Sequence, residues 1–224
     1  MKRLILNFHG VGDPPAGTDP SERAYWWDQS AFISLLDQIR VAVSDNGFPI
    51  AITFDDGNMS DALIALPALV RRGLTARFFL CAGRIGQASY LDKPAIADLV
   101  AAGMRIGSHG MSHVDWRFAS AAELEKETAG ARQVLEDVCA CSVDEAAIPF
   151  GSYDRRVIAT LRRQNWRSVF TSDGGYALEG RWMNPRNSLD RGWQHKRVVE
   201  EICVREGVWR RTARSATRVY KTLR

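Results

Sequence analysis

Apolar residues follow two alternating patterns along this chain of 224 residues. Short apolar runs predict strands, which we place at residues 2–8, 50–54, 74–81, 104–107 and 146–148. Longer stretches, in which apolar residues recur every three or four positions, predict helices at residues 32–43, 60–72, 93–102, 121–138 and 155–163. Strands that alternate with helices are typical of a parallel sheet with helices outside it. We therefore expect an α/β fold.

The chain is long enough to bury one sizeable core, since 46% of its residues are hydrophobic. We therefore expect a single domain over residues 1–224. No apolar run approaches the ~18 residues that a membrane helix needs. Residues 1–9 become polar too early for the apolar region of a signal peptide, so we expect a cytoplasmic protein, although a chain trimmed of a leader would look the same. The sequence does not indicate an oligomeric state.

Four cysteines lie in or beside apolar segments and lack the paired spacing of a zinc site: Cys81, Cys139, Cys141 and Cys203. We expect them to be reduced thiols in the core. Cys139 and Cys141 stand two positions apart, so a small metal-binding pair is the alternative for these two.

The formal net charge of +4 is unevenly distributed. We predict a basic C-terminal helix at residues 208–224, which carries Arg210, Arg211, Arg214, Arg218, Lys221 and Arg224. Such a run is usually a solvated face. The alternative is a patch that contacts a peripheral membrane surface or an acidic polymer. Nothing else in the sequence indicates nucleic acid, so we expect no nucleic-acid partner.

Polar residues follow several predicted strands directly. Asp55, Asp56 and Gly57 come after the strand at residues 50–54. The carboxyl ends of parallel strands are where catalytic groups collect, so the two acids are candidates for a metal ligand and a general base. Asp-Gly is also a common turn signal and Asp a common helix cap, and on its own this stretch favours the structural explanation.

Histidines occupy the same kind of position. His9 follows the first strand, and His109 and His113 follow the strand at residues 104–107. Two histidines four residues apart lie on one side of a helical turn, about 6 Å apart at Cβ, and can reach one metal ion.

Three adjacent aromatic residues, Tyr25 to Trp27, cannot all face one core. We expect them to border a cleft and stack on flat ligands such as sugar rings, with ordinary packing as the alternative.

Three short motifs together resemble those of one enzyme family. Residues 53–57 read Thr-Phe-Asp-Asp-Gly, and residues 148–151 read Ile-Pro-Phe-Gly. Between them, His109 and His113 enclose Gly110, where Ser or Thr more often stands. In this order and at this spacing, the motifs resemble the polysaccharide deacetylase family, also called the NodB homology or carbohydrate esterase 4 group. The resemblance spans residues 4–188.

The resemblance implies a distorted (β/α) barrel of about seven strands and a divalent metal ion. The family's metal ligands fall on Asp56, His109 and His113, and its base falls on Asp55. Zinc is the metal implied first, with cobalt, nickel, iron or manganese as alternatives. The implied reaction removes N-acetyl groups from amino sugars of a polysaccharide, an oligosaccharide or a lipid-linked glycan precursor. We expect the third motif and its neighbour to contact the substrate through Pro149, Phe150, Gly151 and Tyr153.

Two departures from the family pattern change the expected site. Ala147 stands where many members have an arginine that braces the base, and we expect Arg186 to replace it. The family's last motif, a strand that ends in a histidine, is missing, since His195 does not end a strand. In some relatives that act on poly-N-acetylglucosamine exopolysaccharide this histidine is permuted to the N-terminus. His9 is therefore the expected general acid, with His195 or a simple strand-end cap as alternatives.

Two other functions fit the same residues. The first is an amidase that acts on a small non-sugar amide, because similar metal triads serve that reaction. The second is a carbohydrate-binding protein without catalysis. The intact Asp55, Asp56, His109 and His113 argue against the second function, whereas Ala147 and the displaced histidine favour it.

Overall fold

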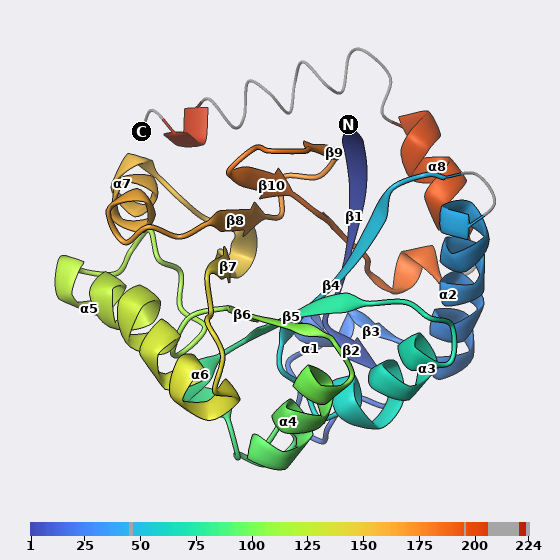
Figure 1. Ribbon diagram of the computed structural model, residues 1–224, viewed down its shortest axis with the longest axis horizontal. Helices are drawn as coiled ribbons and strands as arrows, with labels where there is room; N and C mark the ends of the chain where they lie inside the picture. The colour runs from blue at the N-terminus through green and yellow to red at the C-terminus, as the bar shows by residue number, and fades with distance from the viewer. Residues whose placement is uncertain (45–46, 195, 206–219, 223–224) are drawn as a thin grey trace.

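The computed structural model of the protein describes residues 1–44, 47–194, 196–205 and 220–222. Strands lie at the centre of the molecule and helices surround them (Figure 1). The predicted α/β fold is confirmed, because the main sheet is built from parallel strands that nearly close into a barrel.

Parallel pairing joins the barrel strands in the order β10-β8-β7-β6-β5-β4-β1-β11. Their bounds are β1 (Lys2–Phe8), β4 (Ile50–Asp56), β5 (Ala76–Leu80), β6 (Arg105–Ser108), β7 (Glu145–Ala147), β8 (Ser168–Thr171), β10 (Met183–Pro185) and β11 (Asn187–Ser188). The two ends of this path, β10 and β11, are separated in the chain only by Arg186. Residues 183–188 therefore pair first with β8 and then with β1, and bring the barrel close to closure.

Three short strands lie outside this path. β9 (Tyr176–Leu178) pairs antiparallel with β1. β2 (Gly10–Val11) pairs with β3 (Trp26–Trp27) in a separate parallel sheet. This second sheet attaches the aromatic segment to the residues that directly follow β1.

Alternate residues of each strand point to opposite faces of the sheet. One set, which includes Leu6 and Phe54, packs with helix side chains in the large core outside the barrel. The other set forms a small apolar cluster inside the barrel: Ile5, Phe79, Ala147, Phe170 and Ala177. Nearer the carboxyl ends of the strands, the inward positions carry the buried polar residues Asn7, Thr53 and Asp55. The barrel interior is therefore apolar at one end and polar at the other.

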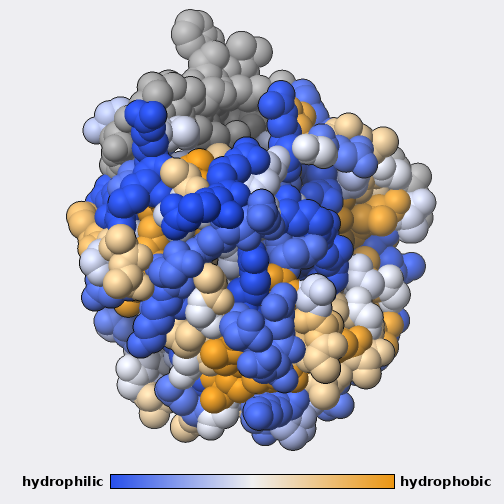
Figure 2. All heavy atoms as spheres, turned by 60° about the vertical axis from the view of Figure 1, so that its left-hand side comes forward, coloured by the Kyte–Doolittle hydropathy of each residue, from blue (hydrophilic) through white to orange (hydrophobic). Residues whose placement is uncertain are grey.

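The helices lie outside the strands. Their bounds are α1 (Pro20–Arg23), α2 (Gln29–Ser44), α3 (Leu66–Val70), α4 (Lys93–Ala101), α5 (Ala121–Glu125), α6 (Ala131–Cys139), α7 (Arg155–Arg163) and α8 (Val198–Arg205). Short 3₁₀ segments are η2 (Ala82–Arg84), η4 (Pro149–Gly151) and η5 (Arg191–Trp193). Hydrophilic residues cover much of the outer face shown in Figure 2, with hydrophobic residues between them. Longer helices such as α2 and α4 bury apolar side chains against the core and leave their other faces to solvent.

Two of the predicted helices contain π-helical turns that the sequence did not reveal. The predicted helix at residues 60–72 begins as η1 (Asp61–Ala65) and continues as α3. The predicted helix at residues 121–138 is interrupted by η3 (Lys126–Gly130), which lies between α5 and α6. A π turn adds one residue to a helix and re-aims the side chains around it, and such turns occur frequently at functional sites.

Two further expectations concern the basic C-terminal helix and the buried cysteines. The predicted basic helix at residues 208–224 lies outside the described residues, apart from residues 220–222, which are helical. Cys81 is buried as expected, but Cys141 is exposed, because the chain leaves α6 through a left-handed residue, Ala140. Among the described residues, no helix combines the length and apolar character needed to cross a membrane.

Candidate active site

A cleft of about 1150 Å³ opens at the carboxyl ends of the barrel strands. Its lining includes titratable side chains from several strand ends: His9, Asp55, Asp56, Arg84, His109, His113, Asp173 and Arg186. It also includes five aromatic side chains: Tyr25, Trp26, Tyr90, Phe150 and Trp193. The structure thus brings the polar residues of the first two sequence motifs to one place, together with Phe150 of the third.

Asp55 lies at the centre of a buried hydrogen-bond network. The fully buried Arg186 donates from Nη1 to Oδ1 at 2.6 Å and from Nη2 to Oδ2 at 2.8 Å. Asn7 donates from Nδ2 to Oδ2 at 3.0 Å, and its own Oδ1 accepts from Thr53 and Arg186. This bidentate contact with the guanidinium of Arg186 fixes the plane of the Asp55 carboxylate. The expected contact between Arg186 and Asp55 is therefore present.

Burial and the guanidinium act in opposite directions on Asp55. Burial alone would raise the pKa of its carboxyl, but the charge and hydrogen bonds of Arg186 hold that pKa well below the ordinary range. Asp55 is consequently an ionised acceptor at neutral pH. A carboxylate has about four acceptor positions, and three are used by Arg186 and Asn7. One position is left for a group in the cleft.

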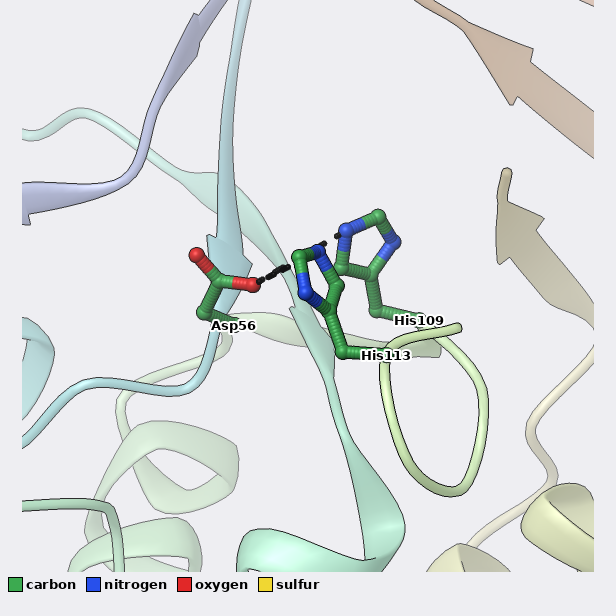
Figure 3. Close-up of side chains that lie close together, drawn as sticks. All are labelled: Asp56, His109 and His113. Carbon is green, nitrogen blue, oxygen red and sulfur yellow. Dashed lines mark ion pairs between the residues drawn. The ribbon is translucent and has the colours of Figure 1, made fainter. Parts of the chain in front are cut away.

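Asp56, His109 and His113 point toward one another (Figure 3). One ligand atom from each lies within 4.8 Å of the other two. Nε2 of His113 is 3.3 Å from Oδ1 of Asp56, and Nε2 of His109 is 3.9 Å from the same oxygen. Two imidazole nitrogens and a carboxylate oxygen are a common donor set for a catalytic zinc ion. The residues present therefore fit a divalent metal ion.

The main chain orients the ring of His109. Nδ1 of His109 lies 2.9 Å from the carbonyl oxygen of Ala147, and a carbonyl can only accept. Nδ1 therefore carries the proton, and the lone pair of Nε2 faces Asp56. Ala147, which replaces the family's usual arginine, thus contributes its carbonyl oxygen to the site.

His113 lies in a loop, and the expected helical turn from His109 to His113 is wrong. Gly110 and His113 both adopt left-handed conformations, with φ of 91° and 56°, so the chain bends back on itself. The two imidazole rings end with their centroids 5.0 Å apart, and Phe150 packs 4.6 Å from the ring of His113. Burial lowers the pKa of His113 to about 4, which favours the neutral form that binds a metal.

His9 lines the cleft beside Tyr25, with ring centroids 4.8 Å apart. Its Nδ1 is buried and has no hydrogen-bond partner among the described residues. Burial lowers the pKa of His9, although Asp56 and Asp55 act in the opposite direction. This direction opposes the role expected of His9, because a general acid must carry a proton at the working pH. His195, the alternative, lies outside the described residues.

The side chains of the adjacent residues Tyr25, Trp26 and Trp27 do not all lie in the same place. Tyr25 and Trp26 line the cleft, whereas Trp27 is fully buried in the core and donates from Nε1 to the carbonyl oxygen of Leu189. The expectation that Trp27 borders the cleft does not hold, because strand alternation in β3 turns its side chain away from Trp26.

The third motif likewise presents one side chain to the cleft. Phe150 is 64% exposed and lines the cleft. Pro149, Gly151 and Tyr153 are buried and do not line it, which corrects the expectation that they contact a substrate directly. The hydroxyl of Tyr153 instead donates to Asp173 at 2.8 Å. These three residues shape the loop that presents Phe150.

Several residues at or beside the site were not predicted from the sequence. Strand alternation could have identified Asn7, because it is in phase with Ile5 on the inner face of β1. Arg84 lies 3.4 Å from Oδ1 of Asp56 and stacks over Tyr90, but no motif indicated it. Asp61 is fully buried, and neither of its oxygens has a partner among the described residues. Burial, together with the negative charges nearby, raises the pKa of Asp61, which favours its neutral form.

Solved structures with similar folds are deacetylases. A Bacillus cereus polysaccharide deacetylase, BC0361, superimposes with a TM-score of 0.76 at 19% identity, over 90% of this chain and 69% of that chain. A Streptococcus pyogenes deacetylase, PplD, in complex with acetate gives a TM-score of 0.75 at 20% identity, over 90% and 98%. A de-N-acetylase from Aggregatibacter actinomycetemcomitans gives 0.75 at 12% identity, over 90% and 100%. At these identities the likeness establishes a shared fold.

Sequence comparison extends this likeness to the family. A curated Bacillus subtilis (strain 168) protein described as a polysaccharide deacetylase, YxkH, is 22% identical over 134 residues. The match covers 60% of this chain and 48% of the relative, so the chain spans about half of that protein's length. The polysaccharide deacetylase family model matches residues 42–169, which is more than half of the chain. The chain therefore belongs to the polysaccharide deacetylase family.

Proposed function

We propose that this protein is a metal-dependent hydrolase that removes N-acetyl groups from amino sugars of a polysaccharide, an oligosaccharide or a lipid-linked glycan precursor. One observation carries the proposal. Three metal-binding side chains, Asp56, His109 and His113, converge beside the ionised Asp55 in the same cleft. Membership in the polysaccharide deacetylase family supports the reaction class.

Asp56, His109 and His113 would hold one divalent ion. Zinc is our first choice because two imidazoles and a carboxylate suit it, with cobalt, nickel, iron or manganese as alternatives. When bound, the ion would supply Lewis-acid chemistry, which polarises an amide carbonyl and makes a water molecule more acidic. The protein contributes the orientation of the donors, above all the Nε2 of His109 that the carbonyl oxygen of Ala147 directs into the site.

Asp55 is the general base in this proposal. Its Oδ2 lies 3.8 Å from Nε2 of His109, so the carboxylate borders the metal-binding atoms. Its remaining acceptor position would take the proton of the attacking water. Arg186 and Asn7 hold the carboxylate in one orientation, so that little reorganisation is needed when the proton moves.

His9 is the general acid that we propose for the departing amine. Since its pKa lies below 6.5, the protonated form should be lost, and kcat/KM should fall, as the pH rises through a value below 6.5. Kinetics of His9→Ala and His195→Ala decide between the two candidates. If His195→Ala loses activity with its metal retained while His9→Ala does not, the assignment to His9 is wrong.

The size of the cleft supports a substrate larger than one sugar. Sites for drug-sized ligands occupy about 300–1,000 Å³, and this cleft measures about 1150 Å³. Tyr25 and Phe150 would present aromatic faces to sugar rings, whereas Trp26, which is largely buried, would contribute only to the wall of the cleft. An exopolysaccharide chain is therefore a suitable substrate class.

Release of acetate from acetylated chito-oligosaccharides tests the proposal directly. The protein is assayed as purified, after chelator treatment, and after zinc is restored, with His113→Ala beside it. We expect acetate from the untreated and restored protein, little from the chelated protein or His113→Ala, and less metal in the variant. Turnover of a small non-sugar amide alone, or sugar binding without acetate release, would overturn the proposal.

A further inference from the structure

Glu127 is a buried carboxylate that contacts the loop between His109 and His113. Its side chain is 4% exposed. Oε2 accepts a hydrogen bond from the backbone nitrogen of Met111 at 2.9 Å, and both oxygens share the backbone nitrogen of Ser112 at 3.1 Å. Hydrogen bonds from N–H groups to an ionised acceptor are stronger than those between neutral groups. The carboxylate therefore fixes the middle of the loop that carries both histidines.

The opposite side of the same loop is held by the segment that follows β5. The backbone nitrogens of Ala82 and Gly83 donate to the carbonyl oxygens of Gly110 and Met111 at 2.9 and 2.8 Å. The carbonyl groups of the loop thus face the backbone of Ala82 and Gly83. Its N–H groups at Met111 and Ser112 face the carboxylate of Glu127. Figure 3 shows the loop as the connection between the two ligating rings, so its shape determines where the second ring lies.

Gly110 is the residue that makes room for Glu127. A Cβ atom added to Gly110 would lie 2.7 Å from Oε2 of Glu127, which is closer than real Cβ contacts allow. Gly110 also has φ of 91°, a conformation that L-residues with side chains rarely adopt. The carboxylate therefore occupies the space that a side chain at position 110 would fill. This accounts for glycine at a position where the family motif more often has Ser or Thr.

Glu127 reaches the loop from the π turn η3. Its neighbour Thr128 is also buried, and the hydroxyl of Thr128 donates to the carbonyl oxygen of Leu124 at 2.6 Å. Burial of a carboxylate costs free energy unless hydrogen bonds compensate for the lost water. Among the described residues, the hydrogen bonds to the side chain of Glu127 all come from the loop between the two histidines.

We propose that Glu127 is a positioning residue of the metal centre, which sets the placement of His113 relative to His109 and thereby the metal affinity. The inference rests on the proposed function, because it takes these histidines to be metal ligands. Glu127 touches neither substrate nor metal in this proposal. It acts through the backbone of the loop, as partners of metal ligands generally do.

Titration of the metal-free full chain with Co²⁺ tests the proposal without any substrate. Glu127→Gln keeps the size of the side chain but turns an N–H₂ group toward the loop's N–H groups. We expect a 10–100-fold loss of metal affinity, measured by competition with a chelator, and an altered Co²⁺ absorption spectrum. Glu125→Gln is the matched control, since Glu125 lies on the adjacent turn, is exposed and contacts Gln164. The control should bind Co²⁺ as the wild type does.

A second pair of variants approaches the same contact from the loop. Gly110→Ala should displace the carboxylate of Glu127 and weaken Co²⁺ binding, as Glu127→Gln does. Gly130→Ala is the control, because a Cβ atom at Gly130 would have only ordinary contacts at 3.8 Å or more. Circular dichroism of the metal-free proteins checks that each variant is folded. Wild-type affinity and an unchanged Co²⁺ spectrum in both Glu127→Gln and Gly110→Ala would overturn this proposal alone. A wild-type protein that binds no metal would overturn the proposed function with it.

Discussion

The two sides of the cleft are constructed differently. On one side, Asp55 and Arg186 come from barrel strands or the residue between them, are almost fully buried, and bind each other through two hydrogen bonds. On the other side, His113 and Phe150 come from loops, and both have positive φ values. We call these the strand side and the loop side. The strand side is held by its own sheet, whereas the loop side depends on residues from other elements.

This difference determines how each side should respond to substitution. Removal of a partner on the strand side leaves a buried charge without compensation, which is costly. Removal of a support on the loop side, such as Glu127, should let a loop shift while the barrel stays folded. The strand side should therefore show large effects on stability and rate, and the loop side smaller effects on affinity.

The largest expected effect is that of Arg186→Met. It leaves the carboxylate of Asp55 buried without a cation, so we expect the free energy of unfolding at pH 7 to fall by about 3–5 kcal/mol. Chemical denaturation measures this loss. Arg191→Met is the control, because Arg191 and its partner Asp28 are both about half exposed, and exposed pairs contribute about 1 kcal/mol or less.

The pH dependence of this loss has a defined sign. The folded-state pKa of Asp55 is lowered, so its contribution to stability is fully present above the unfolded-state pKa of about 4. The contribution is lost as the pH falls below that value toward the folded-state pKa. In Arg186→Met, burial without the cation raises the folded-state pKa of Asp55, so the variant regains stability as the pH falls through that raised value. The difference in stability between wild type and Arg186→Met should therefore shrink steadily as the pH is lowered from 7 to 2. A difference that stays constant down to pH 2 would contradict the assigned charge of Asp55.

Asp55→Asn should have the next largest effect. The amide cannot accept the proton of the attacking water, so we expect kcat/KM to fall at least ~100-fold with the metal content unchanged. Acetate release and elemental analysis measure the two quantities. Asp37→Asn, which alters the exposed carboxylate that pairs with Arg72 away from the cleft, should leave both unchanged. Near-native turnover in Asp55→Asn would remove Asp55 from the mechanism.

The strand side could be predicted from the sequence, and the loop side only in part. Strand ends are visible as apolar runs that stop at Asp55 or His9, and parallel strands bring such ends together. The loop at Gly110 is contacted by Glu127, which comes from a later π turn. Hydrophobic periodicity cannot reveal a π turn, because one added residue changes the pattern no more than ordinary variation does. Trp27 was misplaced for a different reason: the short strand β3, whose alternation turns Trp27 into the core, was not predicted from the sequence.

An intermediate effect is expected for Tyr25→Ala at the rim of the cleft. Loss of one stacking face should raise KM roughly two- to tenfold, which corresponds to about 0.5–1.5 kcal/mol, with kcat little changed. Steady-state kinetics on an acetylated oligosaccharide measures this. Phe118→Ala is the control, because Phe118 is 74% exposed but does not line the cleft. Equal KM values for Tyr25→Ala and wild type would remove Tyr25 from substrate binding.

The smallest effect should come from Lys221, which supports the loop side from the end of the chain. Its Nζ donates to the carbonyl oxygen of Gly151 at 2.9 Å and to Oδ1 of Asp173 at 2.7 Å. The other oxygen of Asp173 accepts from Tyr153 at 2.8 Å. The ammonium group thus ties the η4 loop, which presents Phe150, to the segment that follows β8.

Lys221→Met removes this tie but leaves the barrel and the metal ligands intact. Because Phe150 packs against His113, a looser η4 loop should position the substrate less well. We expect KM to rise about two- to threefold, about 0.5 kcal/mol for a partly exposed ion pair, with metal affinity unchanged. Lys93→Met, at the start of α4, should leave KM unchanged. A loss of metal affinity in Lys221→Met would show instead that the η4 loop and the histidine loop act as one unit. Glu127 and Lys221 would then belong to a single network that supports the loop side.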